Sequence, residues 1–131
     1  MTDRVQPVTS PTLPAPAGPY SPATVSGNLV FVSGQAGRDP ATNALPVDVE
    51  TQTELALKNI AAILEAAGSG LQHVLRCGVF LVDIKEFSKM NTAYARMFAG
   101  HRPARTTVEV SALPGDGMRV EIDAIAVVPS T

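Results

Sequence analysis

The chain has 131 residues and a net charge of -2, and 45% of its residues are hydrophobic while 17% are charged. This length favours a single domain covering residues 1–131, and the apolar content excludes a disordered chain. The slight negative charge argues against a protein that binds nucleic acid by neutralising phosphates. The single cysteine, Cys77, excludes an internal disulfide framework, and no cluster of cysteines and histidines has the spacing of a metal site.

The N-terminal segment, up to about residue 16, is rich in proline, and six of the eleven prolines lie within the first 22 residues. Because proline cannot continue a helix and favours extended backbone, we expect an arm that lies against the domain. The segment lacks the apolar centre of a signal peptide, and no apolar run reaches the roughly 18 residues of a membrane span. We therefore expect a cytoplasmic protein with no membrane partner.

The remaining sequence predicts strands and helices in alternation. A β-branched run predicts the first strand, and apolar residues three and four positions apart predict a helix that ends at Gly68. Asp83 and Glu86 have the spacing of a capping pair at the start of a second helix, which Gly100 ends. The expected elements are a strand at 29–33, a helix at 48–67, a strand at 74–82, a helix at 83–100, and strands at 105–112 and 118–128. This order indicates an α+β sandwich.

The final predicted strand has two different faces. An apolar set that begins with Val120 alternates with a set that changes from Glu121 and Asp123 to Ile125 and Val127. Two helices can cover only one face of the sheet, so the apolar end of the other face needs a partner. The pattern indicates an oligomer with the sheets inside.

Three residues with reactive side chains have simple explanations. Cys77 lies in an apolar strand without an adjacent base, so we expect a buried side chain rather than a nucleophile. His73 and His101 belong to no set of spaced ligands, so we expect ordinary surface or capping residues.

Arg105 and Glu121 suggest a binding site for an anion. Arg105 follows a proline at the start of a strand, and its planar guanidinium suits a carboxylate. A surface arginine and a solvated strand carboxylate are the commoner explanations for such residues. Together the two residues suggest a small anionic substrate held by the arginine, with an acid or base close by.

Short motifs spread along the chain resemble the RidA (YjgF/YER057c/UK114) family, in the order and spacing of that family. They cover nearly everything after the first dozen residues. The most distinctive are GPYSPA at 18–23, LVFVSGQ at 29–35, MNTAY at 90–94, PARTTV at 103–108 and VEIDAIA at 120–126.

The resemblance implies a chorismate-mutase-like α+β fold with a mixed β-sheet and two helices packed on one face. It implies a homotrimer with the sheets inside and with active sites in clefts between subunits. It further implies an enamine/imine deaminase, a hydrolase acting on C=N bonds. Such an enzyme converts reactive 2-enamine or 2-imino acids, such as 2-aminoacrylate, to 2-keto acids and ammonia. No metal and no organic cofactor are expected.

The resemblance also implies residue roles. Arg105 would clamp the substrate carboxylate, and Glu121 would orient or deprotonate the attacking water, although strand geometry alone permits Asp123 as well. The residues expected to bind substrate are Tyr20, Ser33, Gly34, Asn91 and Thr107, with Gly34 and Thr107 acting through backbone groups. Two positions depart from the family: Pro22 stands where glutamine is frequent, and Thr107 stands where several members have cysteine.

Other functions are compatible with the same motifs. A non-enzymatic ligand-binding or chaperone-like trimer would use the same cleft or its outer surface. A pathway-specific deaminase of the family, for example one acting on an aminomuconate, would share the site. RNA cleavage, to which proteins of this family have been linked, fits poorly with the negative net charge.

Overall fold

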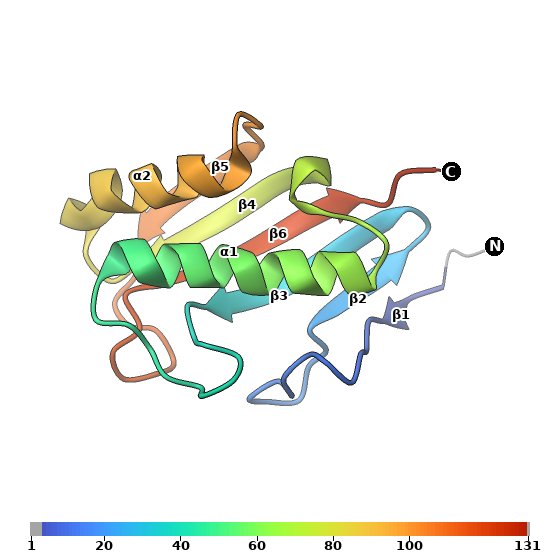
Figure 1. The fold of residues 1–131 in the computed structure, drawn as a ribbon, viewed down its shortest axis with the longest axis horizontal. Helices are drawn as coiled ribbons and strands as arrows, with labels where there is room; N and C mark the ends of the chain where they lie inside the picture. Colours follow the sequence, from blue (N-terminus) through green and yellow to red (C-terminus); the bar gives the residue numbers. More distant parts are fainter. Residues whose placement is uncertain (1–3, 131) are drawn as a thin grey trace.

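The computed structural model describes residues 4–130, so the first three residues of the expected arm lie outside the described residues. The described chain forms one six-stranded sheet in the order β1-β2-β3-β6-β4-β5, with both helices on the same face (Figure 1). The elements are β1 (Gln6–Pro7), β2 (Ala23–Ser26), β3 (Leu29–Ala36), α1 (Val49–Ala66), η1 (Leu71–His73), β4 (Val74–Leu81), η2 (Ile84–Glu86), α2 (Phe87–Phe98), β5 (Ala104–Glu109) and β6 (Val120–Val127).

The sheet is mixed, because β4 and β5 run parallel while the other neighbouring strands are antiparallel. The predicted α+β class, with two helices covering one face of a mixed sheet, is therefore confirmed. Within residues 4–130, neither helix combines the length and the apolar character needed to cross a membrane.

Helix α1 begins and ends close to the predicted residues. The Asp48 carboxylate caps its start by accepting a hydrogen bond from the backbone N–H of Thr51 at 2.9 Å. After Ala66 the chain turns through Gly68, whose φ of +83° is a conformation that favours glycine. The apolar stripe of the helix is buried against the sheet and includes Ala56, Leu57, Ile60, Ile63 and Leu64.

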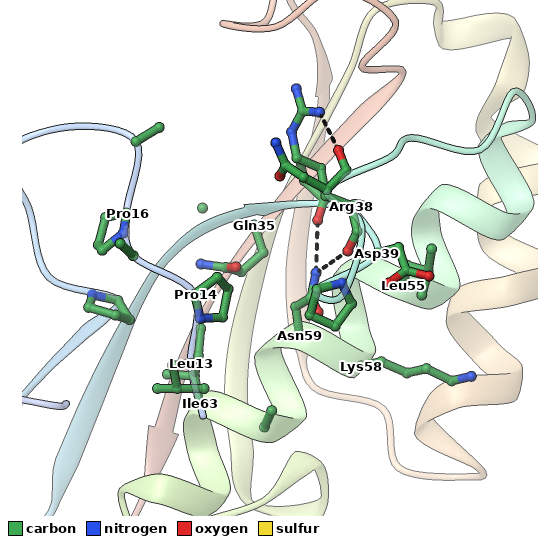
Figure 2. Close-up of a pocket in the computed structure, with 18 of the residues that line it drawn as sticks. Leu13, Pro14, Pro16, Gln35, Arg38, Asp39, Leu55, Lys58, Asn59 and Ile63 are labelled. Carbon is green, nitrogen blue, oxygen red and sulfur yellow. Dashed lines mark hydrogen bonds between the residues drawn. The ribbon is translucent and has the colours of Figure 1, made fainter. Parts of the chain in front are cut away.

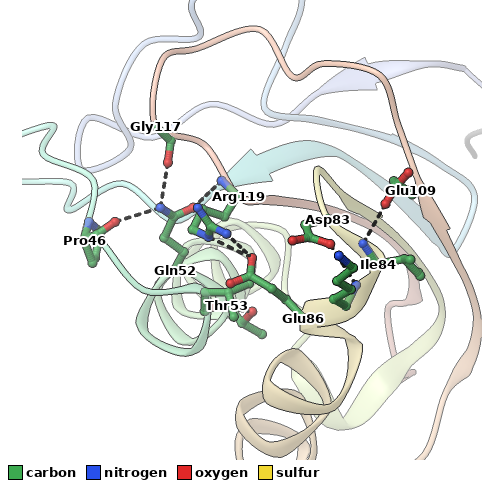
Figure 3. A network of polar contacts seen from close by, with 11 residues as sticks. Pro46, Gln52, Thr53, Asp83, Ile84, Glu86, Glu109, Gly117 and Arg119 are labelled. Atoms are coloured by element: carbon green, nitrogen blue, oxygen red, sulfur yellow. Dashed lines mark hydrogen bonds and ion pairs between the residues drawn. The ribbon is translucent and has the colours of Figure 1, made fainter.

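Helix α2 begins at Phe87 rather than at Asp83, and the expected capping pair is wrong. The Asp83 carboxylate accepts a hydrogen bond from the Lys85 backbone N–H at 3.0 Å and starts the short 3-10 turn η2 instead. Glu86 Oε1 accepts from Arg119 Nε at 2.8 Å and lies 2.7 Å from Arg119 Nη2 (Figure 3). An ion pair with a residue distant in sequence thus replaces the local capping interaction.

The fully buried Gln52 connects the start of α1 to the turn before β6 (Figure 3). Its Nε2 donates to the carbonyls of Pro46 and Gly117 at 2.7 and 2.8 Å, and its Oε1 accepts from the Arg119 backbone N–H at 2.8 Å. Every polar atom of this buried amide is therefore used, as burial requires. Because Arg119 precedes Glu121 by two residues, the same network fixes where Glu121 enters the sheet.

The two faces of the sheet differ as the sequence predicts. The face under the helices carries the core residues of the central strands, including Val30, Val32, Val79, Leu81, Val120, Ile122 and the buried Cys77. On the other face Phe31 pairs with Ile125 and Leu29 pairs with Val127 across β3 and β6. Phe31 is 43% exposed, and no helix covers these four residues, which we call the open-face apolar band.

The described part of the proline-rich segment packs against the rest of the domain. The Val8 backbone N–H donates to the Ala23 carbonyl at 2.8 Å, and Val8 is only 6% exposed. Leu13 packs against the same core. The arm therefore forms a fixed wall beside the end of β3.

Candidate functional site

A β-bulge interrupts β3 at Ser33 and Gly34. Val32 pairs with Ala124 and Gln35 pairs with Ile122, so two residues of β3 lie opposite the single residue between them on β6. Ser33 Oγ donates to the Ser21 carbonyl at 2.7 Å. The Ser33 backbone N–H also donates to the Pro22 carbonyl at 2.9 Å. These two bonds tie the segment that carries Tyr20 to the bulge.

Two glycines make room for two carboxylates on the open face of the sheet. A Cβ atom at Gly34 would collide with the Glu121 carboxylate, and one at Gly78 would lie 2.6 Å from Asp123 Oδ1. Asp123 Oδ1 instead accepts a hydrogen bond from the Gly78 backbone N–H at 2.8 Å. Burial and, to a smaller extent, the negative charge of Asp123 raise the pKa of Glu121. Glu121 is thus a stronger base than an ordinary surface glutamate.

A cavity of about 650 Å³ lies beside these residues, between the arm, the end of β3 and helix α1 (Figure 2). Tyr20, Gly34 and Glu121 line part of it, and Tyr20 is 51% exposed. The structure therefore brings together four predicted site residues, namely Tyr20, Ser33, Gly34 and Glu121.

A second group of predicted residues gathers at the edge strand β5, beneath α2. Arg105 Nη2 donates to Asn91 Oδ1 at 2.7 Å, and the guanidinium carbon lies 4.6 Å from the centre of the Tyr94 ring. The Phe87 ring centre is 5.6 Å away. Cation–π contacts of this kind contribute about 0.5–2 kcal/mol, depending on exposure. Thr107, two residues along β5, is half-buried and pairs with Val79.

The positive charge of Arg105 has no carboxylate partner within ion-pair distance among residues 4–130. Its position is nevertheless determined by Asn91 and by the aromatic rings of α2. A half-buried guanidinium of this kind is suited to binding an external carboxylate.

Tyr94 and Phe87 are not among the predicted site residues, yet both rings contact Arg105. The spacing contains a signal that could have revealed it. Phe87, Asn91 and Tyr94 are four and three residues apart, which places them on one face of a helix. A helix face with two aromatic rings and an amide can bind a cation as well as pack against the core.

The two groups of site residues lie on opposite faces of the sheet. Arg105 pairs with Cys77, whose side chain is buried under the helices, and Arg105 itself contacts α2. Glu121 alternates with the buried Val120 and Ile122, so its side chain is on the open face. A single chain therefore does not bring Arg105 and Glu121 together. The prediction that Glu121 lies close to the arginine is wrong within one copy.

The remaining reactive residues have structural roles. Burial raises the pKa of the Cys77 thiol, so this residue is a core side chain and not an activated nucleophile. His101 Nε2 donates to the Val74 carbonyl at 2.7 Å, which attaches the segment after α2 to the start of β4. Among residues 4–130, no three His, Cys, Asp or Glu side chains gather closely enough to hold a metal ion.

The sequence and the fold match known proteins over nearly the whole chain. The sequence model of a family described as endoribonuclease L-PSP matches residues 11–128. A RutC family protein of Pyrococcus horikoshii is 48% identical over 114 residues, covering 86% of this chain and 90% of that protein. The protein of Bos taurus named 2-iminobutanoate/2-iminopropanoate deaminase is 45% identical over 115 residues, covering 87% and 83% of the two chains.

Solved structures agree with this relationship. A protein of Thermotoga maritima is 43% identical, with a TM-score of 0.88 over 95% of this chain and 98% of that chain. Escherichia coli TdcF, solved with bound serine, is 35% identical, with a TM-score of 0.87 over 93% and 98% of the two chains. Since these likenesses combine sequence identity with the same fold, they show common descent as well as shared architecture.

Proposed function

Because the chain belongs to the endoribonuclease L-PSP family, which includes the YjgF and RidA proteins, we propose that it hydrolyses 2-imino acids to 2-keto acids and ammonia. The observation that carries this proposal is the half-buried Arg105 guanidinium, which Asn91 and Tyr94 hold without a carboxylate partner among residues 4–130. The deaminase name of the bovine relative supports the reaction. The serine bound to TdcF supports the ligand class, since serine has the α-carboxylate and α-nitrogen of an imino acid.

In the proposed reaction Arg105 binds the substrate carboxylate. The guanidinium presents several N–H donors in a plane, and Asn91 uses one of them. A carboxylate bound in this way has a fixed orientation, so the imine carbon is held in one position relative to the attacking water. The imine carbon is already electrophilic, which means that the protein needs only to position the substrate and direct the water.

Glu121 is the proposed base. It takes a proton from water as the oxygen bonds to the imine carbon, and the imine nitrogen gains a proton. The resulting carbinolamine breaks its carbon–nitrogen bond as the hydroxyl proton moves to nitrogen, and ammonia leaves with a 2-keto acid remaining. The raised pKa of Glu121 favours this role, because a carboxylate that binds a proton more tightly accepts it more readily from water.

The complete site requires two copies of the chain, because Arg105 and Glu121 lie on opposite faces of the sheet. We propose a homotrimer in which the open-face apolar band is buried between copies, with the number of copies taken from the family resemblance. The edge strand β5 of one copy then brings Arg105 to Glu121 of the next. Burial of Phe31, Ile125 and their neighbours supplies the hydrophobic driving force for this association.

A direct assay tests the proposed reaction. An amino acid oxidase generates several 2-imino acids in solution, and the appearance of 2-keto acid and ammonia is followed with and without the protein. We expect release well above the spontaneous rate, as for a cytoplasmic enzyme that removes reactive enamines. Saturable binding of the imino or keto acid without faster release would instead identify a non-enzymatic binding protein.

A further inference from the structure

The cavity beside Glu121 extends well beyond the residues assigned to the reaction. Its volume of about 650 Å³ is in the range of pockets that enclose whole drug-sized molecules. The side chain of 2-iminopropanoate is a single methyl group, which would fill only a small part of this space. The cavity is therefore much larger than the smallest substrate of the proposed reaction needs.

The walls away from Glu121 are largely apolar. Figure 2 shows Leu13 and Pro14 of the arm close to Ile63 of α1, with the Gln35 side chain pointing towards Pro14. Ala62, which is exposed on α1, lines the same part of the cavity. Covering apolar surface of this kind with an apolar group of a ligand lowers the free energy of the complex.

Apart from Glu121, the charged side chains that line the cavity make local hydrogen bonds to the backbone or extend away from its apolar part. Arg38 Nη1 donates to the Asn43 carbonyl at 3.1 Å, and Asp39 Oδ1 accepts from the Ala41 backbone N–H at 2.8 Å. Lys58 extends away from the arm in Figure 2. These contacts leave apolar side chains as the main surface that a ligand would meet.

Both walls of the cavity are tied to the sheet. The arm is held by the Val8–Ala23 backbone bond at one end and by the Ser33–Ser21 bond at the other. On the opposite side Asn59 Nδ2 donates to the Arg38 carbonyl at 2.9 Å, which attaches the segment after β3 to α1. A cavity with anchored walls presents one shape to a ligand.

We propose that this cavity receives the side chain of the substrate, and that the protein prefers 2-imino acids with a large apolar side chain over 2-iminopropanoate. The inference rests on the proposed function, because Glu121 places the reacting carbon at one end of the cavity. The substrate of choice is then an imino acid of the leucine or phenylalanine kind. An added methylene in an apolar pocket changes kcat/KM by roughly 10- to 200-fold, so the preference is measurable.

The test compares two substrates and two matched variants. Ala62→Phe fills the cavity from α1, while Ala66→Phe adds the same ring at an exposed position of α1 that does not line the cavity. kcat/KM is measured for 2-iminopropanoate and for the imino acid made from leucine. We expect the wild type to favour the leucine-derived substrate by at least about tenfold. Ala62→Phe should lower kcat/KM for the leucine-derived substrate more than for 2-iminopropanoate and so remove that preference, whereas Ala66→Phe should change neither value.

The outcomes separate this inference from the proposed function. Hydrolysis of both substrates without a preference for the larger one, or equal losses for both in Ala62→Phe, would overturn the side-chain pocket alone. Failure of the wild type to hydrolyse any imino acid would overturn the proposed function and the pocket together. Ala62→Leu, a smaller block, gives an intermediate loss of preference if the cavity holds the side chain, and melting temperatures confirm that each variant is folded.

Discussion

Arg105 and Glu121 lie on opposite faces of one sheet, with strand β4 between the strands that carry them. Arg105 is on the edge strand under α2, and Glu121 is on the open face beside the β3 bulge. Neither can act on a substrate bound to the other within the same copy. The proposed reaction therefore depends on association of the chain with itself.

Phe31→Asp should dissociate the oligomer and abolish deamination. Phe31 is 43% exposed on the open-face apolar band and pairs with Ile125, so an aspartate there would place an unpaired charge in the interface. Light scattering should give three times the chain mass of 13.7 kDa for the wild type and a lower mass for the variant. Val47→Asp is the control, since Val47 is 91% exposed outside the sheet and should leave mass and activity unchanged. An oligomeric, active Phe31→Asp protein would show that this face is not the interface.

The helices and the general sheet pattern could be predicted, because each depends on local spacing. Asp48 and Gly68 delimit α1 through a cap and a positive φ, which are signals within a few residues of the helix. The start of α2 could not be predicted, because Glu86 pairs with Arg119, a partner distant in sequence. The strand β1 and the strand β2, of two and four residues, are too short to show an alternating pattern.

The sequence proposes candidate site residues one by one, but it could not predict how the fold groups them. Alternation along β5 separates its two faces without indicating which of them α2 covers, so the contact between Arg105 and Tyr94 has no signal in the strand itself. The bulge at Ser33 and Gly34 depends on pairing with β6, about ninety residues away in the chain. The division of the site into two groups follows from these non-local pairings.

Arg105→Ala should lower kcat/KM by more than tenfold while the oligomer stays intact. Arg105 is the residue proposed to bind the substrate carboxylate. Loss of a buried charge-assisted contact of this kind costs on the order of 2–5 kcal/mol of binding free energy. Keto acid release from in situ imino acids measures the effect. Arg102→Ala is the matched control, because Arg102 is exposed and its Nη1 donates only to the neighbouring His101 carbonyl among the contacts in the described chain. Wild-type rates for Arg105→Ala would remove the carboxylate clamp from the mechanism.

Glu121→Gln should lower kcat by roughly 10²–10⁴-fold with little change in KM, because the amide keeps the shape of the side chain but cannot accept the proton. Asp123→Asn should have a milder effect, since Asp123 Oδ1 accepts from the Gly78 backbone N–H and an asparagine oxygen can do the same. Single-turnover and steady-state rates separate chemistry from binding. If Asp123→Asn is the inactive variant and Glu121→Gln is normal, the base is Asp123.

The pH dependence of kcat/KM should contain an acid limb from Glu121. Burial and the charge of Asp123 raise the pKa of Glu121, so activity should be lost at a higher pH than for an ordinary glutamate as the solution is acidified. Asp123→Asn removes the negative neighbour but not the burial, and should therefore move the acid limb to lower pH. If the acid limb is unchanged or moves to higher pH, the charge of Asp123 does not raise the pKa of the catalytic base.

The most direct test of the two-copy site mixes two inactive variants. Arg105→Ala and Glu121→Gln chains with different affinity tags are refolded together, and mixed trimers are purified through both tags. In every mixed trimer, one site of the three combines a wild-type Arg105 from one copy with a wild-type Glu121 from the next. We expect mixed trimers to regain about one third of wild-type deaminase activity, although each parent trimer is far less active. Mixed trimers as inactive as both parents would contradict a site shared between copies.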